Sequence, residues 1–141
     1  MENFCSAASR HWDNSAFLSN HNRHQEAAYL AGYAAECALK ALIEEGGLHG
    51  RPFRHSLVGL SVDGLELALL LNPLLRRYEV SPVVADTSGL GRWEETHRYE
   101  ETGFLSEADF QDIVTQANKI ARKILVGFTL DGLLAGGDIP Q

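Results

Sequence analysis

The segment from residue 27 to 45 is apolar around its whole circumference apart from one narrow polar stripe, which consists of Tyr29, Tyr33, Glu36 and Lys40. At about 100° per residue of an α-helix, these four side chains project within roughly 60° of one another. Such a helix is typical of the centre of a helical bundle. Because an unpartnered buried charge costs several kcal/mol, the pattern predicts that other polar groups face the stripe.

Helical periodicity recurs in three further segments, which predicts an all-α protein with four main helices. The first helix is expected over residues 6–19. The helix with the polar stripe is expected to end at Glu45, because Gly46 and Gly47 can adopt the positive φ of a helix C-terminus. The third region covers residues 55–78.

Two breaks are expected in that third region. Residues 61–64 should divide it into a short and a longer helix, and Pro73 should end or kink the longer one. Residues 79–105 show little periodicity and contain several glycines, so they form a long connection of the kind that is often functional.

The last helix has the clearest signals. Ser106 is expected to cap it, with Asp109 at the third helical position, and Leu105 is placed for a hydrophobic staple with Phe110. Apolar residues then recur at helical spacing, and the helix is expected to end near Gly127.

The length of 141 residues and the hydrophobic content of 45% suit one domain over residues 1–141, with a core over about 6–126 and a C-terminal tail over 127–141. Cys5 and Cys37 are expected to be reduced and to serve packing. No signal peptide or membrane-spanning run is recognisable, so a cytoplasmic protein without membrane contact is expected.

The net charge of −7 argues against nonspecific binding of polyanions over the whole surface. Any contact with RNA must therefore use a local patch. One candidate patch follows the second helix and contains His49, Arg51, Arg54 and His55.

Three segments together resemble a known family. The run AAYLAGYAAECALKALI at 27–43 resembles the second helix of HEPN domains (higher eukaryotes and prokaryotes nucleotide-binding). The run HSLVGL at 55–60 resembles the His-x-Leu-x-x-Leu start of the following segment in that family. Trp93 with Arg98 and Tyr99 resembles the Trp and Arg-Tyr element before its last helix.

The resemblance extends over about residues 7–126 and implies an antiparallel four- to five-helix up-and-down bundle. It also implies a homodimer and a role in nucleotide or RNA chemistry, often beside a nucleotidyltransferase partner. Membership of a family does not by itself fix an activity.

The segment before the last helix contains Arg92, His97 and Tyr99 in the spacing Arg-x4-His-x-Tyr, which resembles the ribonuclease motif of one HEPN branch. In that branch the histidine acts as a general base or orients the 2′-hydroxyl, and the arginine offsets charge on the phosphorane, so no metal is required. That branch has a polar residue after the arginine, whereas this chain has Trp93. Whether the chain is an enzyme therefore stays open.

A structural interpretation of the same segment is favoured. Arg98 is expected to reach Glu36 on the buried stripe, while Trp93 and Tyr99 pack over it and attach the loop to the bundle.

Tyr29, Tyr33 and Lys40 have two interpretations as well. They form a satisfied polar seam, or they line a nucleotide pocket in which the rings stack on a base and the lysine meets a phosphate. Because no metal-ligand cluster or phosphate loop accompanies them, neither a metal nor a cofactor is expected.

The sequence thus predicts a HEPN-like module that binds a nucleotide or RNA and works with a nucleotidyltransferase. Two alternatives remain: a metal-independent endoribonuclease of toxin type that uses Arg92 and His97, and a module for protein interaction or dimerisation only.

Overall fold

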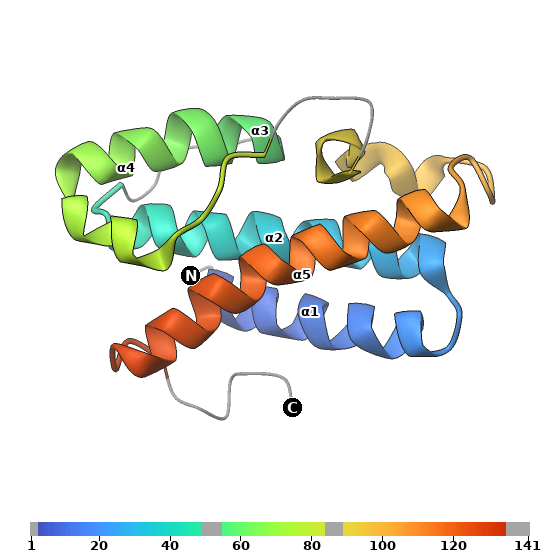
Figure 1. The fold of residues 1–141 in the computed structure, drawn as a ribbon, viewed down its shortest axis with the longest axis horizontal. Helices are drawn as coiled ribbons and strands as arrows, with labels where there is room; N and C mark the ends of the chain where they lie inside the picture. The colour runs from blue at the N-terminus through green and yellow to red at the C-terminus, as the bar shows by residue number, and fades with distance from the viewer. Residues whose placement is uncertain (1–2, 49–54, 84–88, 135–141) are drawn as a thin grey trace.

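The computed structural model describes residues 3–48, 55–83 and 89–134, and all regular structure within these ranges is helical (Figure 1). The first two helices, α1 (Phe4–Asn20) and α2 (His24–Glu45), form an antiparallel pair. The prediction of an all-α helical bundle is confirmed.

The helix α2 lies in the middle of the bundle (Figure 1). On the side opposite α1 lies a helical stretch that runs from α3 (Leu57–Gly59) through the π-helical turn η1 (Leu60–Gly64) into α4 (Leu65–Leu71). The last helix, α5 (Glu107–Leu130), packs across α2.

Short 3₁₀ segments precede α5: η2 (Pro73–Tyr78), η3 (Gly89–Arg92) and η4 (Glu95–Tyr99). After η2, residues 79–83 run back along the bundle towards the end where η3 and η4 lie (Figure 1). The expected long connection therefore contains local helical order, and it brings η3 against α5 and η4 against α2.

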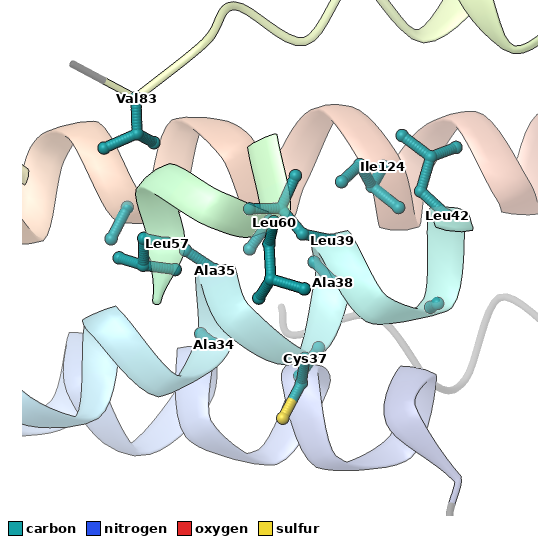
Figure 2. Packing of buried hydrophobic residues seen from close by; sticks show 14 of the residues in the cluster. Ala34, Ala35, Cys37, Ala38, Leu39, Leu42, Leu57, Leu60, Val83 and Ile124 are labelled. Carbon is teal, nitrogen blue, oxygen red and sulfur yellow. The ribbon is translucent and has the colours of Figure 1, made fainter. Parts of the chain in front are cut away.

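Alanines allow the neighbours of α2 to approach closely. Alanine has the highest helix propensity and adds little bulk, so it favours both the helix and the close contact. Leu39 and Leu42 of α2 pack in the same core as Leu60 of η1 and Ile124 of α5 (Figure 2). The fully buried alanines of α2 are Ala27, Ala31, Ala34, Ala35 and Ala38.

The predicted end of α2 and the predicted start of α5 are confirmed. Gly47, with φ of +97°, follows the end of α2, whereas Gly46 keeps a right-handed conformation. The hydroxyl of Ser106 accepts a hydrogen bond from the Asp109 N–H at 3.1 Å and caps α5. The ring of Phe104 meets the ring of Phe110, with 5.4 Å between ring centroids.

The expected division at residues 61–64 into a short and a longer α-helix is present, but the divider is the π-helical turn η1 and the helical stretch is not broken. Leu60 and Leu65 are both buried, and this packing outweighs the low helix propensity of Gly64. Ser61 is also buried, and its hydroxyl accepts a hydrogen bond from the Val83 N–H at 2.8 Å. The polar residue thus attaches the returning chain rather than ending a helix.

The expected end of the last helix at Gly127 is wrong, since α5 continues to Leu130. A Cβ at Gly127 would lie 2.6 Å from the ring of Tyr78, so the glycine makes room for that ring inside the helix. Phe128 then continues the buried face of α5 and meets the ring of Tyr78 edge-on.

Candidate functional site

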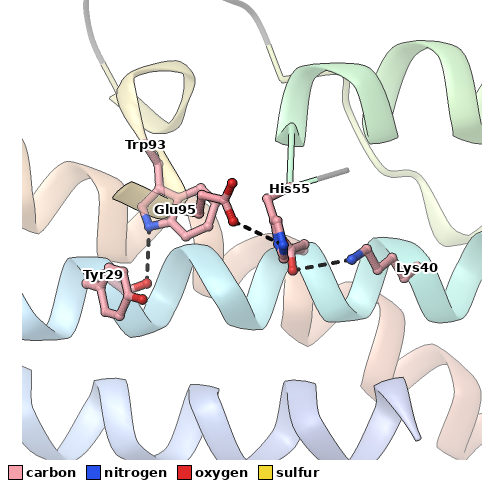
Figure 3. Close-up of polar contacts among 6 residues, drawn as sticks. Tyr29, Lys40, His55, Trp93 and Glu95 are labelled. Atoms are coloured by element: carbon pink, nitrogen blue, oxygen red, sulfur yellow. Dashed lines mark hydrogen bonds and ion pairs between the residues drawn. The ribbon is translucent and has the colours of Figure 1, made fainter. Parts of the chain in front are cut away.

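The polar stripe of α2 is organised around the carboxylate of Glu36, which is only 3% exposed. Lys40, one helical turn further on, places Nζ 3.5 Å from Oε2. His55, two residues before α3, places Nδ1 2.8 Å from Oε1 (Figure 3). Both oxygens of the buried carboxylate therefore face a hydrogen-bond donor, as a buried charge requires.

The ring of His55 also reaches the segment η4, where its Nε2 lies 3.0 Å from Oε2 of Glu95. The ring therefore bridges two carboxylates, the buried one of Glu36 and the half-exposed one of Glu95. This bridge connects α2, the start of α3 and η4.

Trp93 lies over α2 because Gly32 leaves room for it. A Cβ at Gly32 would lie 2.0 Å from atoms of the indole, and the indole Nε1 donates a hydrogen bond to the carbonyl oxygen of Tyr29 at 3.1 Å (Figure 3). The ring of Tyr33 meets Trp93 edge-on, with 5.1 Å between ring centroids. Burial, and then the hydrogen bond with Tyr29, raises the pKa of the Tyr33 phenol.

Arg98 does not pair with Glu36, contrary to the interpretation of the sequence. His55 and Lys40 already occupy both carboxylate oxygens. The exposed guanidinium of Arg98 lies over the ring of Tyr99, with 4.8 Å between Cζ and the ring centroid, and its interactions with Tyr99 and then Tyr29 raise its pKa. Tyr99 itself is 75% exposed, so only Trp93 covers the stripe as expected.

Arg92 and His97 are held by different partners. Nη1 of Arg92 lies 3.2 Å from Oδ2 of Asp109 at the start of α5. Nδ1 of His97 accepts a hydrogen bond from the Glu94 N–H at 3.3 Å, and its ring meets Phe104 edge-on. Within the described ranges, no hydrogen bond, ion pair or ring contact joins Arg92 to His97.

The environment of His97 shifts its pKa. Burial lowers the pKa, although the nearby carboxylates of Glu94 and Glu100 act in the opposite direction. Burial thus favours the neutral form of the ring. Because Nδ1 accepts the backbone hydrogen bond, this pattern assigns the single ring proton to Nε2.

A pocket of about 320 Å³ lies between η4, the first turns of α2 and the first turns of α5; we refer to it as the η4 pocket. Four aromatic side chains contribute to its walls, together with His97 and Arg98 of η4. Two carboxylates, those of Glu26 and Glu100, line it as well. Arg92 is not among its lining residues. The aromatic lining consists of Tyr29, Trp93, Phe104 and Phe110.

Three residues that shape this region were not identified from the sequence in these roles. Gln25 donates to the carbonyl oxygen of Glu101 at 3.2 Å and accepts from the Gly103 N–H at 2.8 Å, so it fixes the loop before α5. Glu95 holds His55, and His55 binds Glu36 rather than only its own helix start. Irregular segments carry no periodic signal that could have revealed these contacts.

The remaining residues of the predicted basic patch, His49, Arg51 and Arg54, lie outside the described residues. In the part of the chain that is described, no group of three or more His, Cys, Asp or Glu side chains is arranged to hold a metal ion. No helix in the same ranges has the length and apolar character needed to cross a membrane.

Residues 1–126 match the family model of the HEPN domain. The chain belongs to the HEPN domain family. Comparisons with curated proteins and with solved structures gave no significant match. The resemblance inferred from residues 27–43 is thus confirmed, and membership supports a nucleotide- or RNA-related module in general.

We predict that Glu36→Ala destabilises this HEPN domain by about 3 kcal/mol or more, because it leaves Lys40 and His55 without their buried partner. Glu36→Gln keeps the volume and an acceptor, so it should cost less. Glu95→Ala, which removes a half-exposed partner, serves as the control and should cost about 1 kcal/mol or less. Thermal melts measure all three, and equal, negligible shifts would show that Glu36 does not organise the stripe.

Proposed function

We propose that this HEPN domain binds a nucleotide or single-stranded RNA in the η4 pocket. The observation that supports the proposal is the combination of aromatic walls with the exposed guanidinium of Arg98 in one pocket. Aromatic side chains stack on any base, and arginine adds attraction to phosphate and to the face of a base. Because Glu26 and Glu100 also line the pocket, the proposal relies on stacking against the aromatic rings and on the single contact of Arg98, not on a net positive charge.

The geometry supports binding rather than catalysis. A general base must present an unprotonated nitrogen to the 2′-hydroxyl, whereas the proton of His97 is on Nε2 and Nδ1 is occupied by a backbone N–H. Arg92, the proposed clamp for the phosphorane, is paired with Asp109 and lies outside the pocket lining.

We predict that ligand binding quenches the emission of Trp93, measured in a Trp12→Phe background so that one tryptophan remains. Titration with nucleoside monophosphates and with a single-stranded oligouridylate should give saturable curves. Arg98→Ala should weaken binding about tenfold, since one charge-assisted contact is worth about 1–3 kcal/mol. Arg10→Ala, an exposed arginine on α1, is the matched control. Unchanged emission at millimolar ligand, or equal affinity of both variants, would contradict the proposal.

The nuclease alternative is tested with purified protein and single-stranded RNA in EDTA. We predict that the RNA stays intact, because Arg92 and His97 are held by other groups. Robust cleavage that leaves a 2′,3′-cyclic phosphate, and that is lost in both Arg92→Ala and His97→Ala without unfolding, would replace the binding proposal by an endoribonuclease.

We also propose that the domain forms a homodimer and works beside a nucleotidyltransferase. The support for a dimer is an exposed apolar surface on α4 and η2, where Leu70, Leu71 and Leu74 are 60–77% exposed. The nucleotidyltransferase is inferred from the family resemblance alone, and co-elution of the two purified proteins tests it.

Sedimentation should show twice the chain mass of 15.5 kDa. The double variant Leu70→Glu with Leu74→Glu should sediment as a monomer, because two buried charges without partners disfavour the interface. Phe17→Glu, which changes an exposed apolar residue of α1, should leave the dimer intact. A wild-type monomer at tens of micromolar protein would contradict the homodimer.

A further inference from the structure

A second pocket, of about 550 Å³, lies between η2 and the C-terminal half of α5; we refer to it as the α5 groove. It brings together four cationic side chains and two carboxylates, so its local formal charge is +2. The whole chain has a net charge of −7, so this surface is positive on a protein that is negative overall. The cations are Arg77, Lys119, Arg122 and Lys123, and the carboxylates are Glu79 and Asp131.

The cations on α5 share one face of the helix. Lys119, Arg122 and Lys123 are three and four residues apart, which places their side chains beside one another. Lys123 is positioned by a hydrogen bond of 3.0 Å from its Nζ to the carbonyl oxygen of Glu79. Lys119 and Arg122 are exposed and make no ion pair with any other described residue.

The carboxylates of the groove do not cancel this charge. Oδ2 of Asp131 lies 3.1 Å from Nη2 of Arg77 and accepts a hydrogen bond from the hydroxyl of Tyr78 at 2.6 Å. Arg77 and Asp131 therefore compensate each other. Three cations remain against the single exposed carboxylate of Glu79, which follows η2 in a left-handed conformation with φ of 52°.

We propose that the α5 groove binds phosphate groups, those of a nucleotide or of an RNA backbone, and forms a site separate from the η4 pocket. The two pockets share no lining residue. Lysines on one helix face beside a guanidinium provide several donors to an anion with more than one charge. Lys119 and Lys123 also line a neighbouring pocket of about 270 Å³ with Ser81 and Gln116, which leaves room for a nucleoside beside its phosphates.

Inorganic tripolyphosphate is the direct probe, because it has no base and cannot stack on the aromatic rings of the η4 pocket. Titration calorimetry should show binding to the wild type and a loss of about tenfold or more in the double variant Lys119→Glu with Arg122→Glu. The control is Arg10→Glu with Arg23→Glu, two exposed arginines elsewhere, which changes the net charge equally and should retain binding. Arg98→Ala should retain it too, whatever its effect on the η4 pocket.

Glu79→Gln supplies a test in the opposite direction. It removes a like charge from the groove without shortening the side chain, so tripolyphosphate should bind about twofold to threefold more tightly. Unchanged or weaker binding would contradict the assignment of Glu79 to the site, and with it the groove. Circular dichroism melts of all variants confirm that the bundle is folded.

Two further probes identify the source of the phosphate. Displacement of tripolyphosphate by adenosine triphosphate supports a free nucleotide. The affinity for a single-stranded oligouridylate is measured at several salt concentrations. An RNA backbone is supported if the slope of log affinity against log salt concentration becomes shallower by about one unit in the Lys119→Glu, Arg122→Glu variant. Absence of tripolyphosphate binding, an equal loss in the control pair, or equally tight binding of polyglutamate would overturn a phosphate site.

Discussion

The buried carboxylate of Glu36 is the constraint on which the surroundings of α2 depend. A charge at the centre of a helical bundle must be compensated where it lies, and here one compensating group comes from α2 itself and the other from the chain before α3. The second ring nitrogen of His55, Nε2, contacts the carboxylate of Glu95, and this contact attaches η4 to the bundle. Since η4 carries His97 and Arg98, the position of the η4 pocket follows from the compensation of one buried charge.

Local pattern was sufficient for much of the fold. The periodicity of α2 and α5, the cap at Ser106 and the turn at Gly47 depend on residues close in sequence, so they were predictable. The wrong helix end at Gly127 has a physical cause. A glycine is compatible with a helix when a residue distant in sequence occupies the space that a side chain would fill, and the sequence around Gly127 does not show that Tyr78 packs there.

The candidate site was predictable in part. The stripe on α2 indicated that Glu36 needs partners, because burial and charge conflict wherever the partner comes from. The stripe could not indicate that His55 rather than Arg98 binds Glu36. That choice depends on how the segments before α3 and α5 pack against α2, which the sequence pattern does not show. The α5 groove was also predictable only in part. Helical spacing places Lys119 beside Lys123, but the position of Arg77 in the same groove depends on the tertiary fold.

The alanine content of α2 has a thermodynamic consequence. An alanine side chain has no rotamers to lose, so ordering the alanine positions of α2 costs backbone entropy and no side-chain entropy. The larger buried side chains of the same helix, and those of α5, give up rotational freedom when they pack. Within the central helix, the entropic cost of ordering a side chain is therefore lower at the buried alanines than at Leu39, Leu42 and Ile43.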